Sequence, residues 1–197
     1  MGDKQVFQPL TREDMITVVL YRCGIVLSAI IIAGMSFLLS GASSNSGSVP
    51  ADVLLYSLYA AVGISVFFIH LYVGSFKKFL KNLYFIGLVA LIALLVLGRG
   101  SLSGALAARP YAALLLLPLS GCLGFVTAKE AFCFRLFEGY LLAMIMPVYL
   151  LLVSGGMLSH DGALYGMALI ATLLVVFTLR KVSMPVAYDI GDKSAYR

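Results

Sequence analysis

The sequence predicts an all-α fold, a polytopic transmembrane helical bundle of about six spans in a single domain covering residues 1–197. The first observation is composition: 61% of the residues are hydrophobic and 12% are charged, whereas a soluble domain carries about 25% charged residues. The second is a series of long apolar stretches, and the third is that basic residues lie at the ends of these stretches. Lipid must therefore be the solvent for most of the chain.

Six stretches approach the roughly 20 apolar residues that a helix needs to cross the hydrocarbon layer. The stretches are continuous rather than alternating in polarity, which favours helices over a β-barrel. The first follows 14 mostly polar residues and is too long for a signal peptide, so it is interpreted as a transmembrane helix. We place the spans near residues 16–40, 52–75, 82–98, 109–127, 137–154 and 162–180, with a cytoplasmic tail over 181–197.

The expected connections are short segments rich in polar, charged or small residues. They comprise the Gly/Ser-rich residues 41–50, a break at Lys77, Lys78 and Lys81, the small-residue stretch 99–109, the charged residues 128–136 and a turn over 154–161. Pro118 and Pro147 could break the fourth and fifth helices.

The distribution of basic residues predicts the orientation. The ends of the chain together with the second and fourth connections hold 12 of the 14 Lys and Arg residues, and the opposite side holds Arg99 and Arg109. Because cytoplasmic loops are enriched in Lys and Arg, both termini are expected in the cytoplasm or stroma, in a thylakoid or cell inner membrane. The same pattern explains the net charge of +5 without a nucleic-acid partner. Tyr21 and Tyr84 are among the tyrosines expected at the inner membrane interface.

Two ionisable residues lie well inside the expected spans, where such groups are costly and indicate function. For Arg22 the alternatives are extension of its side chain to the interface and pairing with an acid, such as Asp14 or a residue of the fourth connection. For His70 the alternatives are a hydrogen bond between helices and a ligand to a pigment or metal, because a neutral imidazole can ligate the magnesium of a chlorophyll or the iron of a haem. Chlorophyll and carotenoid are the cofactors considered, and no other is expected. A bis-histidine haem is excluded because His160 lies at the opposite side.

The fourth connection alternates charged and aromatic residues, which favours a segment lying among the lipid headgroups. We expect it to converge with Arg22 and His70 near the cytoplasmic interface and to form a docking surface, in which Glu130 and Glu138 select a basic partner. The alternative is a solvated turn with aromatic anchors. The predicted docking residues are Lys129, Glu130, Phe132, Phe134, Phe137 and Glu138, extended by Asp189 and Asp192 of the tail.

Recognisable catalytic or metal-binding patterns are missing from the sequence. The three cysteines, Cys23, Cys122 and Cys133, form no CxxC pair, and there is no HExxH or GxSxG motif. Asp192 interrupts the Gly-Lys-Ser order in the tail, so no phosphate-binding loop is expected. We therefore expect no catalytic residues, no metal site and no enzymatic activity.

Several of these residues resemble an uncharacterised integral-membrane family, the domain of unknown function 2301. The matching residues are Lys129 to Phe134 with Glu138, the tail from Asp189 to Ser194, Tyr21-Arg22 with Gly24, and Ile69-His70 with Tyr72. The resemblance covers nearly the whole chain and implies a protein of cyanobacteria and plastid-bearing eukaryotes. It further implies a role in the photosynthetic membrane, in building or maintaining a photosystem.

Three function classes remain for comparison. The favoured one is an auxiliary or assembly protein for a membrane complex such as photosystem I, because motif-like segments lie outside the spans and few polar groups lie inside them. A small-solute or ion transporter or channel is the alternative, and it would need ionisable groups near the bilayer midplane. An enzyme acting on lipid or pigment would need a nucleophile–base or metal constellation, which the sequence does not provide.

Overall fold

The computed structural model of the chain describes residues 11–41, 48–71 and 73–190. Within these residues the fold is all-α, and six helices are long and apolar enough to cross a membrane, as the sequence predicts. The elements are α1 (Arg12–Leu39), α2 (Ser48–Phe68), α3 (Gly74–Leu97), α4 (Leu102–Ala108), the 3-10 helix η1 (Pro110–Leu116), α5 (Leu117–Phe134), α6 (Phe137–Ser154), α7 (His160–Val182) and α8 (Ala187–Ile190).

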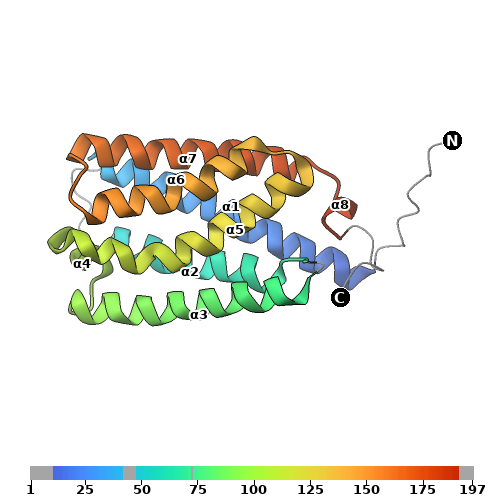
Figure 1. Cartoon of the computed structure of the whole chain (residues 1–197), viewed down its shortest axis with the longest axis horizontal. Helices are drawn as coiled ribbons and strands as arrows, with labels where there is room; N and C mark the ends of the chain where they lie inside the picture. The colour runs from blue at the N-terminus through green and yellow to red at the C-terminus, as the bar shows by residue number, and fades with distance from the viewer. Residues whose placement is uncertain (1–10, 42–47, 72, 191–197) are drawn as a thin grey trace.

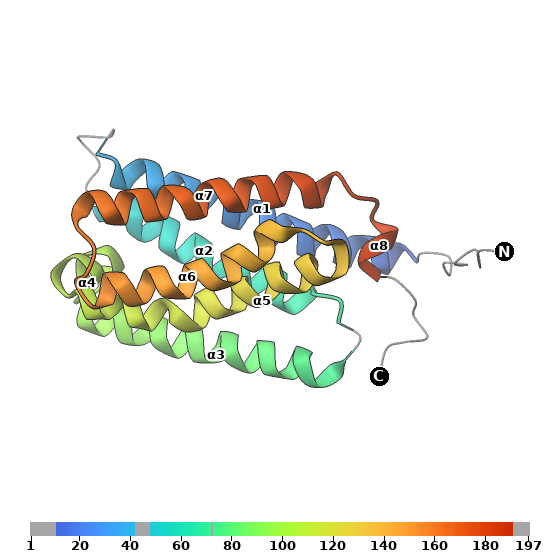
Figure 2. The ribbon, with the colours of Figure 1, turned by 45° about the horizontal axis from the view of Figure 1, so that its top comes forward.

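Five of the long helices form a closed ring around the core. In chain order around the ring, α1 packs on α2, α2 on α5, α5 on α6, α6 on α7, and α7 returns to α1, while α3 lies against α5 and η1. All of them run along the long axis of the molecule (Figure 1). The second view shows α7 beside α1 and α6 beside α5, consistent with these contacts (Figure 2).

Small residues allow neighbouring helices to approach closely, which is how helices pack without a hydrophobic driving force in lipid. A Cβ atom added at Gly24 of α1 would lie 2.6 Å from the carbonyl oxygen of Ala61 of α2. At Gly139 of α6 it would lie 2.4 Å from the carbonyl oxygen of Thr127 of α5. Backbone therefore lies against backbone at the α1–α2 and α5–α6 contacts.

The helices extend beyond the expected spans where charged residues lie at their ends. The first turns of α3 contain Lys77, Lys78 and Lys81, which were predicted to interrupt the chain, and α5 continues through the predicted fourth connection to Phe134. Long side chains at a helix end can reach water while the backbone stays helical, so charge ends the hydrocarbon span without ending the helix. Only Arg135 and Leu136 lie between α5 and α6.

The prolines and the third connection also differ from expectation. Pro147 lies inside α6, which is continuous, and Pro118 lies in the first turn of α5, where a missing N–H is tolerated. The stretch 99–109, predicted as a loop, contains the short helix α4. Ser101 caps α4 by accepting a hydrogen bond from the Gly104 N–H at 3.0 Å.

Candidate functional site, a buried ion cluster

The most unusual feature of the structure is a set of charged side chains enclosed at one end of the ring, here called the ion cluster. It consists of Arg22 from α1, Lys129 and Glu130 from α5, Lys181 from α7 and Asp189 from α8. Glu130 and Lys181 are 0% exposed, and Asp189 and Arg22 are buried as well. Such groups are rarely enclosed unless they are paired, and inside membrane proteins they indicate a functional site.

Glu130 is the centre of the cluster. Its Oε1 accepts a hydrogen bond from the Tyr21 hydroxyl at 2.7 Å and lies 2.6 Å from Nζ of Lys129. Its other oxygen pairs with Lys181, whose Nζ also lies 3.8 Å from the centre of the Phe134 ring. One carboxylate thus connects α1, α5 and α7.

Asp189 connects the C-terminal segment to the same cluster. One of its oxygens lies 2.6 Å from Nε of Arg22, and the other pairs with Lys181. The guanidinium of Arg22 also donates to the carbonyl oxygens of Met184 at 2.7 Å and Pro185 at 3.1 Å. Because these contacts use both the backbone and a carboxylate of the same segment, Arg22 fixes the chain between α7 and α8 against α1.

The local sequence explains why charged residues lie inside. The buried stripe of α7 continues at helical spacing into Lys181, and that of α5 continues into Glu130. The members of these stripes are Ile170, Ala171, Leu174, Phe177, Thr178 and Lys181 in α7, and Leu123, Val126, Thr127 and Glu130 in α5. Both charges therefore project into the bundle because their positions on the helix require it.

The described cluster holds three cations, Arg22, Lys129 and Lys181, and two carboxylates, Glu130 and Asp189. Enclosed ion pairs lose hydration, which offsets much of the attraction between the charges. Their main effect is therefore to fix the relative positions of the helices that carry them. Removing one partner leaves an uncompensated charge, at a cost of about 3–5 kcal/mol. The arrangement consequently opposes any movement that would separate α1, α5, α7 and α8 at this end.

His70 lies beside the cluster, between α2 and α3. Its Nε2 is 3.2 Å from Oγ1 of Thr17 in α1. The second span was expected to continue to residue 75, but α2 ends at Phe68, so His70 contacts α1 from the connection and not from within a helix. Burial, followed by the positive charges of Lys129 and Lys77, lowers the pKa of His70 below its ordinary value of 6.5. Thr17 contacts one ring nitrogen, and the other, Nδ1, is buried without a hydrogen-bond partner among the described residues. These contacts do not identify a pigment, so the predicted role of His70 as a pigment ligand stays a prediction.

The turn between α5 and α6, here called the aromatic turn, comprises residues 132–137. Phe132 is 79% exposed and Phe137 is 67% exposed. Arg135 adopts the left-handed conformation with φ 55°, which reverses the chain direction within two residues. Glu138, the next residue along, pairs with Arg180 of α7.

The structure corrects part of the predicted docking surface. Glu130 and Asp189 are buried and paired, so they are closed to a partner, and Lys129 and Phe134 also contact the ion cluster. The reason is that α5 continues as a helix through the predicted loop, so the face that carries Glu130 points into the bundle. Phe132 and Phe137 are exposed as expected, while Asp192 lies outside the described residues.

Arg22 and Glu130 belong to the same ion cluster, linked through Asp189 and Lys181, but the acidic partner of Arg22 is neither Asp14 nor a residue of the predicted fourth connection. Asp14 instead caps α1, where it accepts the backbone N–H of Thr11 at 2.9 Å. The acid that pairs with Arg22 is Asp189, which the segment after α7 places against α1.

Sequence reasoning missed Lys181 and Tyr21. Lys181 was assigned to the cytoplasmic tail, and Tyr21 was assigned with Tyr84 to the membrane interface, yet Lys181 is 0%, Tyr21 1% and Tyr84 7% exposed. The i, i+3, i+4 spacing of Leu174, Phe177, Thr178 and Lys181 was the available signal, because it continues the apolar stripe of α7 into the charged residue.

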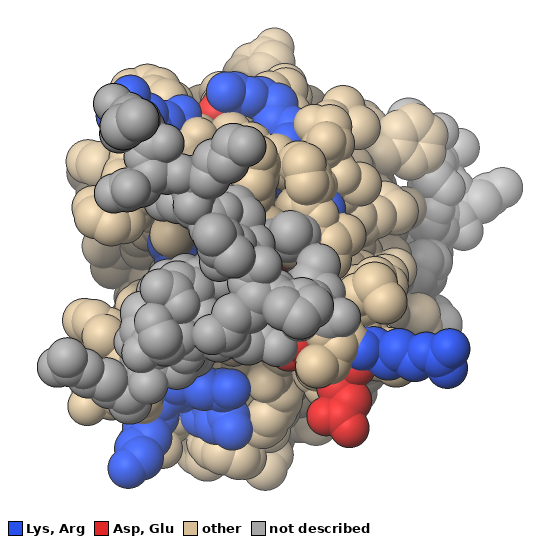
Figure 3. All heavy atoms as spheres, turned by 90° about the vertical axis from the view of Figure 1, so that its right-hand side faces the viewer, with Lys and Arg blue, Asp and Glu red and all other residues tan. Residues whose placement is uncertain are grey.

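Figure 3 looks onto this end of the molecule and shows several Lys and Arg side chains around it, with a smaller acidic area beside them. Nine of the eleven described Lys and Arg residues belong to this end by the course of the helices; they are Arg12, Arg22, Lys77, Lys78, Lys81, Lys129, Arg135, Arg180 and Lys181. Among the described residues, no group of three or more His, Cys, Asp or Glu side chains is placed to hold a metal ion.

Comparison with known proteins gives a relative and a family. A protein of Haemophilus influenzae named "Uncharacterized protein" is 27% identical over 199 residues, covering 100% of this chain and 99% of the relative. This relative shows that such proteins are not restricted to cyanobacteria and plastids, so the taxonomic expectation is not supported. No solved structure matches the chain. The family described as "Uncharacterized integral membrane protein (DUF2301)" matches residues 64–197, and the chain belongs to this family.

Proposed function

We propose that the protein is a non-catalytic auxiliary membrane protein that docks onto another membrane-protein complex through its aromatic turn. The supporting observation is the exposure of Phe132 and Phe137 on a turn whose neighbouring residues are held by ion pairs. Exposed aromatic side chains commonly supply most of the binding energy at protein interfaces.

The position of the ion pairs makes this turn a rigid platform. Glu130, two residues before Phe132, is held by Tyr21, Lys129 and Lys181. On the other side, Glu138 directly follows Phe137 and pairs with Arg180. A turn held in place on both sides loses little conformational freedom on binding, which favours association.

The charge of the platform differs from the initial expectation. With Glu130 enclosed, Arg135 is the exposed charge between the two phenylalanines. The proposed partner surface is therefore apolar with acidic groups around it, rather than basic, since complementary charge contributes specificity.

A photosystem such as photosystem I is the narrower form of this proposal. Its support is the photosynthetic association that the resemblance implies, and the Haemophilus influenzae relative weakens that support. The proposal therefore requires a membrane-protein complex as partner, and photosystem I is one candidate in organisms that contain it.

The orientation that accompanies the proposal places both termini and the aromatic turn on the cytoplasmic or stromal side. The uneven distribution of Lys and Arg supports it, with 12 of 14 on one side. Reporter fusions at the N-terminus, at residue 45 and at the C-terminus provide the test. The two termini should report the inside and residue 45 the outside; residue 45 on the same side as a terminus would contradict the orientation.

The transporter alternative receives less support from the positions of charged residues. The long helices carry no charged residue and no histidine through their central parts, residues 23–39, 53–68, 82–97, 117–128, 139–154 and 162–179. Transporters of polar solutes and ions commonly place such groups near the bilayer midplane. The proposed docking role needs none there.

The test of docking is native purification of a tagged protein with the double substitution Phe132→Ala and Phe137→Ala. We expect the variant to insert and to melt like the wild type, because both side chains are exposed, but to lose the co-purifying complex. The matched control is Phe37→Ala, which removes a 60% exposed phenylalanine from the opposite end of α1.

The competing interpretation is that the two phenylalanines only anchor the turn among lipid headgroups. In that case the double variant would keep every partner that the wild type purifies. Retention of the complex by the double variant, or equal loss of it in Phe37→Ala, would overturn the proposal. Solute transport by the purified wild type in liposomes would favour the alternative instead.

A further inference from the structure

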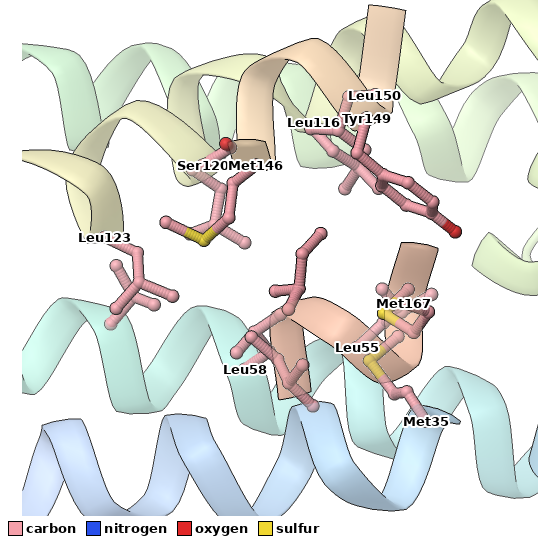
Figure 4. Close-up of a pocket in the computed structure, with 14 residues that line it drawn as sticks. Met35, Leu55, Leu58, Leu116, Ser120, Leu123, Met146, Tyr149, Leu150 and Met167 are labelled. Carbon is pink, nitrogen blue, oxygen red and sulfur yellow. The ribbon is translucent and has the colours of Figure 1, made fainter. Parts of the chain in front are cut away.

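The ring of helices encloses an apolar cavity of about 90 Å³ in the half of the bundle away from the ion cluster. All five helices of the ring contribute to its lining, together with η1. Figure 4 shows Met35, Met146 and Met167 with the leucines around this space. On α6, the cavity residues Met146 and Tyr149 lie in the second half of the helix, away from the aromatic turn.

The chemistry of the lining selects an apolar occupant. Twelve of its fourteen residues are Ile, Leu, Met or Val, and the other two are Ser120 and Tyr149. The Tyr149 hydroxyl already donates to the carbonyl oxygen of Ala163 at 3.0 Å. A buried water needs two to four polar partners, and the cavity offers too few, so hydrocarbon suits it better than water.

The size of the cavity restricts the occupant further. An engineered apolar cavity of about 150 Å³ holds one benzene molecule, so about 90 Å³ admits a few methylene groups but not a pigment macrocycle. Methionine side chains are flexible and fill irregular space, so three of them allow the lining to adapt to a chain end.

Two observations identify the source of such an occupant. The cavity lies between helices that are long and apolar enough to cross a membrane, so lipid chains surround the ring. Several lining residues, among them Met35, Leu58 and Met167, are only partly buried, so the cavity is not sealed on all sides. From this geometry we infer that the cavity binds the terminal part of a hydrocarbon chain, supplied by a membrane phospholipid or by a free fatty acid. The inference stands independently of the proposed docking role.

The experiment uses photolabelling of the full chain in nanodiscs. In one arm the probe is a phosphatidylcholine whose acyl chain carries a diazirine near its end, and in the other it is the free fatty acid with the same chain. Adducts are mapped by mass spectrometry at Met146, which is 5% exposed, and at Met144, which is 69% exposed on the same helix. Met144 measures contact with bulk lipid, and Met146 measures entry into the cavity.

We expect adducts at Met146 and Met167 as well as at Met144, and the arm that produces them identifies the source of the chain. Filling the cavity with Ser120→Leu should reduce labelling at Met146 about tenfold, the effect of a steric penalty of about 1.4 kcal/mol, and leave Met144 unchanged. Leu58→Phe fills the cavity from α2 and provides the same test if Ser120→Leu does not fold. Labelling of Met144 without Met146 and Met167 in both arms, or undiminished labelling of Met146 in a folded filling variant, would overturn the inference.

Discussion

The ion cluster and the cavity lie in the same ring of helices, but their side chains are held in different ways. In the cluster, directional contacts fix each group: Glu130 has partners from α1, α5 and α7, and Asp189 has partners from α1 and α7. In the cavity, the lining consists of flexible apolar side chains around unfilled space. One region defines a single geometry, whereas the other can adapt its shape.

This difference shows how one bundle can combine a fixed surface with an adaptable interior. Enclosed ion pairs oppose displacement because each separated charge would remain without compensation. Apolar contacts lack direction, so side chains such as Met35 and Met167 can change conformation at small cost. The aromatic turn belongs to the fixed part of the bundle and the cavity to the adaptable part.

The largest effect is expected for Glu130→Ala. Removing this carboxylate leaves the charges of Lys129 and Lys181 without the partner that they share. The free energy of unfolding in mixed micelles should therefore fall by about 3–5 kcal/mol. The matched control is Glu138→Ala, whose partner Arg180 is half exposed and retains water, and which should cost about 1 kcal/mol or less. Equal losses in the two variants would show that burial of the cluster does not matter for stability.

The next effect concerns the C-terminal segment. Asp189→Asn removes the carboxylate that Arg22 and Lys181 share, and hydrogen bonds to charged groups contribute about 1.5–3 kcal/mol. Tryptic cleavage after Lys181 in detergent should therefore accelerate at least about tenfold, because the segment opens more often. Asp161→Asn, at the start of α7 and the other end of the bundle, is the control and should leave this rate unchanged.

A smaller contrast is expected between two leucines of α6. Leu142 is 0% exposed in the packed half, whereas Leu150 lines the cavity. Truncation to alanine should cost about 2 kcal/mol or more at Leu142 and about half of that at Leu150, where fewer packing contacts are lost. Thermal unfolding of both variants in the same detergent gives the comparison, and a larger loss at Leu150 would contradict the proposed looser packing.

The smallest effect is a pH dependence from His70. Its pKa in the folded protein lies below the ordinary value of 6.5 because of burial and the nearby Lys129 and Lys77, with Asp189 and Asp14 acting in the opposite direction. The unfolded chain therefore takes up the proton first, so stability is complete above the unfolded pKa and decreases as pH falls through it.

The wild type should consequently melt at a lower temperature at about pH 5.5 than at about pH 7.5. His70→Gln keeps a polar side chain near Thr17 but cannot titrate, and it should remove most of that difference. An unchanged pH dependence in His70→Gln would assign it to other groups.

Much of the fold could be predicted from the sequence because hydropathy directly measures suitability for lipid. The six apolar stretches correspond to the six long helices, and Arg22 and His70 were recognised because charged or ionisable residues are rare inside such stretches. Helix ends were less predictable. The lysines around residue 77 and the segment from Lys129 to Phe134 were interpreted as connections, although helices can continue beyond the hydrocarbon layer.

The composition of the site was only partly accessible from the sequence. Pairing of Arg22 with Asp189 depends on the return of the chain after α7, which brings together residues 167 positions apart. Hydropathy does not predict which distant segments of the chain come into contact. The stripe that ends at Lys181 was present in the sequence, whereas the cavity was not, because it arises from the fit between side chains of five helices and η1.

The central claim is that enclosed ion pairs hold the C-terminal segment and the aromatic turn to the bundle. A double-mutant cycle of Arg22→Leu and Asp189→Leu, measured by unfolding in mixed micelles, tests it most directly because the cycle isolates the energy of the pair. We predict a coupling energy of about 1.5 kcal/mol or more, as expected for a buried contact between charged groups. Additive effects, with a coupling energy below about 0.5 kcal/mol, would contradict the claim.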